Sequence, residues 1–156
     1  MTRRRPQVFI SYQRTDRDVA CRVREHLRAD GFSTWMDRFD IPVGAYWPDE
    51  IDRALDSSDT VVGILSPDAA ASRNVKNEWD WAIANHRRLV LLQVAACTVP
   101  HRYVAINFID ATGPDLDRAL AELLRSSVLL AERAFTAGSR RFWPVPTVAG
   151  PPVPCV

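Results

Sequence analysis

The residues best suited to chemistry stand where short apolar runs of the chain end. Such runs are followed by Ser11-Tyr12-Gln13-Arg14, by Asp37 and by Ser66. Hydroxyl, phenol, guanidinium and carboxylate groups all hydrogen-bond polar ligands, and the fork of a guanidinium suits phosphate oxygens. The pattern therefore predicts that a functional site lies at these run ends.

Composition excludes several other kinds of site. The six glycines are scattered, so neither a dinucleotide-binding GxGxxG loop nor a Walker A loop is present, and Lys76 is the only lysine. The three cysteines form no CxxC pair, so we expect no metal and no cofactor. A net charge of +1 disfavours nucleic acid as a partner.

The chain also lacks the patterns of membrane insertion and export. Its longest apolar run, residues 89–97, is interrupted by Gln93 and is too short to span a bilayer. The basic opening leads into only a few apolar residues, fewer than a signal peptide needs. We therefore expect a cytoplasmic protein that does not enter a membrane.

Predicted strands and helices alternate along the chain, and they must position the residues that follow the apolar runs. Compact apolar runs predict strands over 8–10, 34–36, 61–65, 89–94 and 106–109. Amphipathic stretches between and after them predict helices. This alternation predicts an α/β fold, namely a flavodoxin-like open five-stranded parallel sheet of order 2-1-3-4-5 with helices on both faces. In such sheets ligands bind beyond the carboxyl ends of the strands.

The domain organisation follows from the same pattern. Residues 1–6 are predicted to be a basic N-terminal extension, 7–133 the domain, and 134–156 a Pro-rich tail or linker. Two side chains are expected to be buried: Trp47, packing ahead of Pro48, and Ile83, on the inner face of a helix that begins at 72–74.

Two common functions of this architecture do not fit. A phosphoacceptor receiver needs acidic residues after the first and third strands, where this chain has Ser11-Tyr12 and Leu65-Ser66. A flavin-binding domain needs a small, hydroxyl-rich loop after the first strand, where residues 13–17 are bulky and charged.

Five segments, in order, resemble the Toll/interleukin-1 receptor (TIR) domain family, bacterial type. They are Val8-Phe9-Ile10-Ser11-Tyr12, residues 31–37, residues 41–47, Ile64-Leu65-Ser66-Pro67, and Ser72 followed six residues later by Glu78. The resemblance covers roughly residues 6–133.

The resemblance implies one of two activities. Some TIR domains are enzymes that cleave the nicotinamide–ribose bond of NAD, giving nicotinamide and ADP-ribose or a cyclic ADP-ribose, and their catalytic glutamate matches Glu78. Others are non-catalytic scaffolds that signal through homotypic TIR–TIR contacts, for which the matching loop is 38–47. Either activity implies self-association and a bacterial immune or signalling role. Asn74 stands where many enzymatic members carry a tryptophan.

A single carboxylate is chemically sufficient for cleavage of the nicotinamide–ribose bond. Most glycosidases use a second carboxyl group to protonate the leaving oxygen. The leaving group of NAD is a cationic pyridinium that departs as neutral nicotinamide, so it needs no general acid. One carboxylate near the ribose stabilises the oxocarbenium-like transition state electrostatically. Glu78 lies three residues after Val75 and four before Ala82, so it borders an apolar helix stripe, as an ordinary flanking glutamate also would.

Six further residues are candidates for holding NAD, and all of them except Tyr46 have a purely structural alternative. Tyr12 would stack on a ring or cover the core, and Arg14 would contact the pyrophosphate or remain solvated. Asp37 would hydrogen-bond a ribose or cap its loop. Ser66 would approach the ribose or cap the next turn. Tyr46 and Trp47 are candidates for an aromatic wall of the site.

Overall fold

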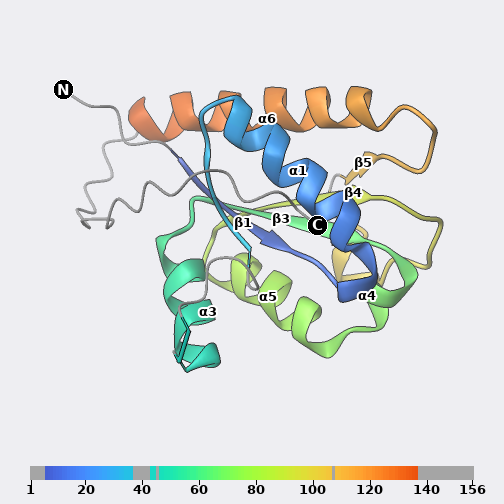
Figure 1. Cartoon of the computed structure of the whole chain (residues 1–156), viewed down its shortest axis with the longest axis horizontal. Helices are drawn as coiled ribbons and strands as arrows, with labels where there is room; N and C mark the ends of the chain where they lie inside the picture. Colours follow the sequence, from blue (N-terminus) through green and yellow to red (C-terminus); the bar gives the residue numbers. More distant parts are fainter. Residues whose placement is uncertain (1–5, 37–42, 45, 107, 137–156) are drawn as a thin grey trace.

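Five parallel strands form one sheet in the order β2-β1-β3-β4-β5 in the computed structural model of the chain (Figure 1). This is the predicted flavodoxin-like order, with helices on both faces. The structure describes residues 6–36, 43–44, 46–106 and 108–136. Asp37 and most of the 38–47 loop lie outside the described residues, as do residues 1–5 and the tail beyond residue 136.

The strands form where the sequence is apolar and rich in β-branched residues. They are β1 (Gln7–Ser11), β2 (Ser33–Trp35), β3 (Thr60–Leu65), β4 (Arg88–Gln93) and β5 (Phe108–Asp110). Every residue of β3 is buried, as expected for a central strand covered on both faces.

The helices begin and end at recognisable signals. They are η1 (Arg14–Asp16), α1 (Arg17–Ala29), α3 (Trp47–Ser57), α4 (Pro67–Ala71), α5 (Arg73–Ala84), η2 (His101–Tyr103) and α6 (Leu116–Thr136). Gly31 follows α1 with a φ of +91°, a left-handed conformation that favours glycine. The Ser72 hydroxyl accepts a hydrogen bond from the Val75 N–H and so caps α5.

Two helical layers enclose the sheet (Figure 1). Helices α1 and α6 pack on one face, and α3, α4, α5 and η2 pack on the other, each over its own cluster of buried side chains. The chain passes from β1 to β2 on one side and later returns to β3 on the other side of β1. The carboxyl ends of β1 and β3 therefore meet at a topological switch point, where open α/β sheets place their ligand sites.

Two packing predictions were wrong. Trp47 is 48% exposed, because the part of α3 that packs on the sheet begins one turn later, at Ile51. Ile83 is 44% exposed, because it stands about 100° around α5 from buried Ala82 and so faces away from the sheet. The short helix α4 was also not predicted, although its Ser66 cap and first-turn proline are typical of a helix start.

Candidate functional site

Glu78 reaches the end of β1. Ser11 is the last residue of β1 and is 1% exposed. Its side chain faces α5, because strand residues two apart share a face and Phe9 packs in the α5 cluster. The Ser11 hydroxyl donates a hydrogen bond to Oε2 of half-buried Glu78. A carboxylate is therefore held at the switch point by a buried hydroxyl.

A glycine in the neighbouring strand lets α5 approach this closely. Gly63 of β3 pairs with Ser11 on one side and with Leu91 on the other. A Cβ at residue 63 would lie only 2.5 Å from Nε1 of Trp79, so the indole rests directly on the glycine backbone. Trp79 is fully buried and immediately follows Glu78, so its seat on Gly63 fixes the height of Glu78 above the sheet.

The short helix η2 also packs against α5. The Tyr103 hydroxyl lies 2.7 Å from Oδ1 of Asp80, and Arg102 lies 2.7 Å from Oδ2 of the same carboxylate. The Tyr103 ring meets Trp79 edge-on, with 5.2 Å between ring centroids. Burial, reinforced by the hydrogen bond to Asp80, raises the pKa of Tyr103 well above its usual range. Both residues that follow Glu78 are thus fixed.

Replacing Tyr103 with phenylalanine is expected to lower the free energy of unfolding by about 1.5 kcal/mol, because Asp80 loses a hydroxyl donor. The variant should also lose the decrease in the free energy of unfolding that wild type shows at alkaline pH. The raised pKa of Tyr103 means that the unfolded chain releases this proton first, so wild-type stability falls as pH rises above the ordinary tyrosine value of 10. Urea unfolding between pH 8 and pH 11 measures both effects, and parallel curves for the two proteins would contradict the assignment.

A second hydroxyl–carboxylate pair joins the segments that follow β1 and β3. The Ser66 hydroxyl donates to Oδ2 of Asp16 at 2.5 Å and accepts from the Ala69 N–H at 3.1 Å. Burial raises the pKa of Asp16, the Ser66 hydrogen bond lowers it, and the nearby Asp68 raises it further. Ser66 is only 3% exposed, and its hydroxyl already donates to Asp16 and accepts from Ala69. Its capping alternative is thus observed, and its burial leaves little surface for a ribose contact.

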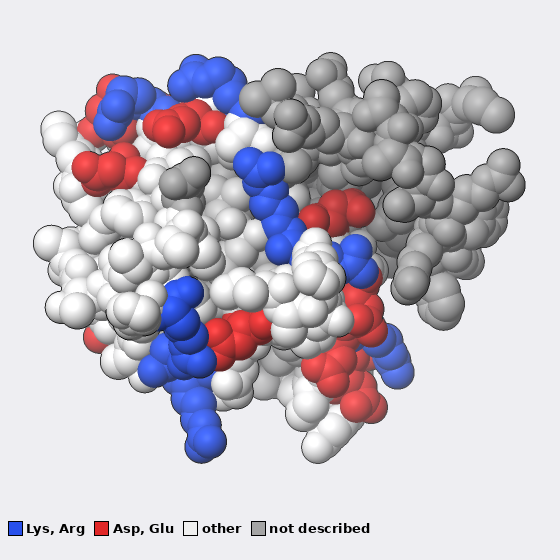
Figure 2. Space-filling model, turned by 180° about the vertical axis from the view of Figure 1, so that it is seen from behind, with Lys and Arg blue, Asp and Glu red and all other residues white. Residues whose placement is uncertain are grey.

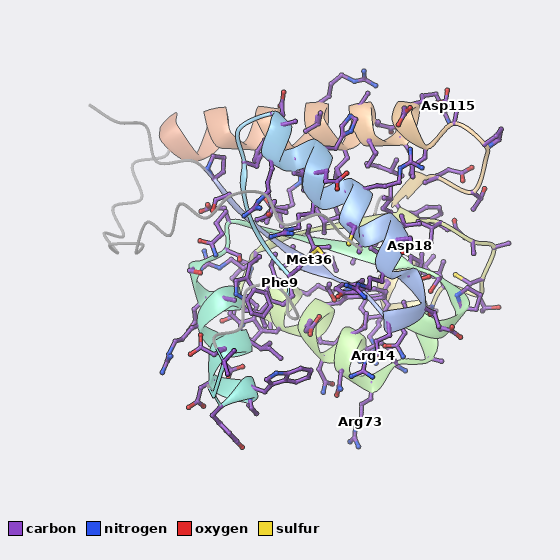
Figure 3. All side chains as sticks on the ribbon, viewed as in Figure 1. Phe9, Arg14, Asp18, Met36, Arg73 and Asp115 are labelled. Atoms are coloured by element: carbon purple, nitrogen blue, oxygen red, sulfur yellow. The ribbon has the colours of Figure 1, made fainter. Side chains whose placement is uncertain are left out.

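The other predicted ligand residues come from several different elements. Tyr12 directly follows β1 but is only 9% exposed and packs among side chains of the α1 face. Arg14, the first residue of η1, is exposed (Figure 3). Tyr46 and Trp47 are 70% and 48% exposed at the start of α3, which covers the same face as α5. Asp37 lies outside the described residues.

The sequence did not single out Ser11 or Asp16 as partners of Glu78 and Ser66. Strand alternation from Phe9 was a usable signal for Ser11, because it places the hydroxyl on the α5 face. No comparable signal marks Asp16, whose contact with Ser66 spans 50 residues of chain.

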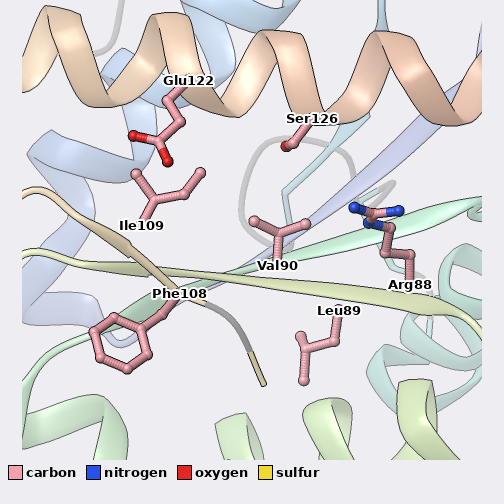
Figure 4. Close-up of a pocket in the computed structure, with 7 residues that line it drawn as sticks. All are labelled: Arg88, Leu89, Val90, Phe108, Ile109, Glu122 and Ser126. Carbon is pink, nitrogen blue, oxygen red and sulfur yellow. The ribbon is translucent and has the colours of Figure 1, made fainter. Parts of the chain in front are cut away.

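A cavity lies elsewhere in the molecule. It has a volume of about 310 Å³ and is lined by Arg88, Leu89, Val90, Phe108, Ile109, Glu122 and Ser126 (Figure 4). It opens beside the first residues of β4 and under α6, whereas Glu78 belongs to the carboxyl ends of the strands. None of the predicted site residues lines this cavity. The candidate site is therefore identified by its position at the switch point and not by the volume of a cavity.

The described part of the chain shows neither a strongly charged face in Figure 2 nor a metal-binding cluster. Basic and acidic side chains are interspersed on the face shown in Figure 2. Among the described residues, no three His, Cys, Asp or Glu side chains gather closely enough to hold a metal ion. No helix in the described ranges has the length and apolar character needed to cross a membrane.

The doubly wound parallel sheet of order 2-1-3-4-5, with helices on both faces, places the fold of the chain in the flavodoxin-like class. A flavodoxin-like domain from Synechococcus has the same fold, with a TM-score of 0.53 at 17% identity over 83% of this chain and 99% of that one. The TIR domain of the Toll-related receptor TRR-2 from Hydra magnipapillata gives a TM-score of 0.68 at 20% identity, covering 78% of this chain and 97% of that one.

The TIR domains of the activated Roq1 resistosome, which directly recognises the pathogen effector XopQ, are also similar. Their TM-score is 0.51 at 17% identity, over 85% of this chain and 82% of that one. No curated protein matches the chain. The family model described as TIR domain matches residues 8–124, and the chain therefore belongs to the TIR domain family.

Proposed function

We propose that this TIR domain is an NAD nucleosidase that cleaves the nicotinamide–ribose bond, giving nicotinamide and ADP-ribose or a cyclic ADP-ribose. The observation that supports the proposal is the carboxylate of Glu78, held at the switch point by the Ser11 hydroxyl. Glu78 is the proposed catalytic residue, and its negative charge stabilises the oxocarbenium-like ribose in the transition state. Nicotinamide leaves as a neutral molecule with the electron pair of the broken bond, so its departure needs no general acid, no metal and no cofactor. Water then bonds to the ribose carbon and loses a proton to give ADP-ribose, or a nucleophilic atom of the same ADP-ribose bonds there to give the cyclic product.

The other predicted site residues supply the proposed contacts with NAD. Exposed Arg14 contacts the pyrophosphate through its guanidinium fork. Asn74 has no aromatic ring, so exposed Tyr46 and Trp47 provide the stacking surface. Asp37 hydrogen-bonds a ribose.

A scaffold function is the second candidate, because large apolar side chains of the 38–47 loop are exposed. Val43 is fully exposed, Tyr46 is largely exposed and Trp47 is about half exposed. Exposed apolar residues in one region are typical of a protein–protein contact. In this alternative the chain is a non-catalytic adaptor that acts through TIR–TIR contacts. The two functions coexist if self-association completes the NAD site. In both, residues 7–133 act in the cytoplasm, in bacterial immune signalling.

Nicotinamide release tests the enzymatic proposal. Purified protein is incubated with NAD over a wide range of protein concentrations, and also bound at high density to vesicles through an affinity tag. We expect release per molecule to rise with concentration, because association completes the site. Absence of nicotinamide under every condition would exclude the nucleosidase and leave the adaptor. Chromatography of the products then distinguishes linear from cyclic ADP-ribose.

A further inference from the structure

Ser11 is a buried polar residue that the proposed reaction does not itself require. It is 1% exposed and belongs to a strand whose other inward side chains are apolar. A buried hydroxyl without a hydrogen-bond partner costs free energy, and here the Glu78 carboxylate supplies the partner. Ser11 donates its single proton to this group, so it is directed toward Glu78 and not toward solvent.

The contact constrains Glu78 in two ways. A glutamate side chain on a helix has several rotamers, and a hydrogen bond to Oε2 selects the one that reaches the end of β1. A hydroxyl that donates to a carboxylate also favours the ionised carboxylate over the neutral acid. Ionised Glu78 at one fixed position is the state that stabilises a cationic ribose.

The packing of α5 on β1 and β3 fixes the position of Glu78 relative to Ser11. Ser11 and Gly63 are paired across β1 and β3, and Trp79 rests on Gly63. Glu78 is therefore carried toward Ser11 by a helix that is fixed against the same pair of strands. A short side chain is needed at residue 11, because the helix already lies close to the sheet.

We propose that Ser11 is a positioning residue that holds Glu78 ionised and oriented toward the substrate. This inference rests on the proposed nucleosidase function. Ser11 acts through Glu78 and does not itself touch NAD. The rotamer and charge of Glu78, and not the integrity of the fold, are what the Ser11 hydroxyl controls.

Three variants isolate this role. Ser11→Ala removes the hydroxyl, and Ser11→Cys keeps the shape with a somewhat larger atom while offering only a weak donor. Ser58→Ala is the matched control, because Ser58 is equally buried but donates to the backbone carbonyl of Ala54 at 2.6 Å. Ser58→Ala should lose stability without any effect on Glu78. The cysteine variant provides the answer if the alanine variant fails to fold.

The kinetic readout is the pH dependence of nicotinamide release. We expect kcat to fall about 10- to 100-fold in both Ser11 variants, with little change in KM. The acid limb of the kcat profile should move to higher pH in both, and it should stay in place in Ser58→Ala. Unchanged profiles in the Ser11 variants of an active enzyme would overturn the positioning role and leave the nucleosidase proposal intact.

A second readout does not need activity. The carboxyl carbon of Glu78, labelled with ¹³C, is titrated by NMR in the wild-type chain and in each variant. Loss of the Ser11 donor should move the Glu78 titration midpoint upward by about one pH unit. If wild type releases no nicotinamide, the nucleosidase fails, but an upward shift still supports control of Glu78 by Ser11. A midpoint that does not move overturns that control in either case.

Discussion

Nicotinamide release is expected to fall about 100- to 1,000-fold when Glu78 is replaced by glutamine. The amide has nearly the same shape as the carboxylate, and its oxygen can still accept the hydrogen bond that Ser11 donates. The substitution therefore removes the negative charge while retaining the packing. Because the charge is proposed to stabilise the transition state more than bound NAD, kcat should fall and the affinity for NAD should change little. Single-turnover release at saturating NAD measures the loss.

Glu25→Gln is the matched control for this variant. Glu25 is an exposed glutamate on α1, so its amide changes the net charge by the same amount without touching the switch point. Its rate should equal that of wild type. Equal release by wild type and Glu78→Gln would remove Glu78 from the mechanism, and the search for the catalytic group would move to Asp16, the other carboxylate at this edge.

The arrangement of the sheet could be predicted because local patterns determine it. Each strand is a short apolar run, and the alternation with helices forces parallel pairing through crossover connections. Val75, Trp79 and Ala82 were correctly predicted to be buried, because they recur with the period of a helix. Ile83 fits the same period from Trp79, yet it lies at the margin of the stripe. Periodicity finds the buried face of a helix but does not give its width.

The contacts that build the candidate site could not be predicted in the same way. Helix phase placed Glu78 beside a buried stripe, but its partner Ser11 is 67 residues away. The seat of Trp79 on Gly63 depends on the register of β1, β3 and α5 together. A run such as residues 60–65 shows a buried strand, and nothing within it says which side chain rests on its glycine. Pairings of this kind belong to tertiary structure.

Gly63→Ala is expected to destabilise the fold by about 3 kcal/mol, because it overpacks the core at the point where α5 meets the sheet. The added methyl group would lie 2.5 Å from Trp79 Nε1 and 2.8 Å from Leu91 Cδ2. Both neighbours are completely buried, so neither can swing into solvent to make room. Urea unfolding measures the loss. Gly113→Ala is the control and should be near neutral, because no atom lies within 4 Å of its added Cβ.

A double-mutant cycle separates this clash from a general weakness of the strand. Trp79→Phe removes the Nε1 and Cε2 atoms that the new methyl group would meet, so the two substitutions should cost less together than the sum of their separate costs. Additive costs would mean that Gly63 is needed for some reason other than the indole. A shift of Trp79 would also move its neighbour Glu78 on α5. Gly63→Ala should therefore also slow nicotinamide release under conditions where the variant remains folded. Normal release by the folded variant would show that the height of α5 above the sheet does not set the position of Glu78.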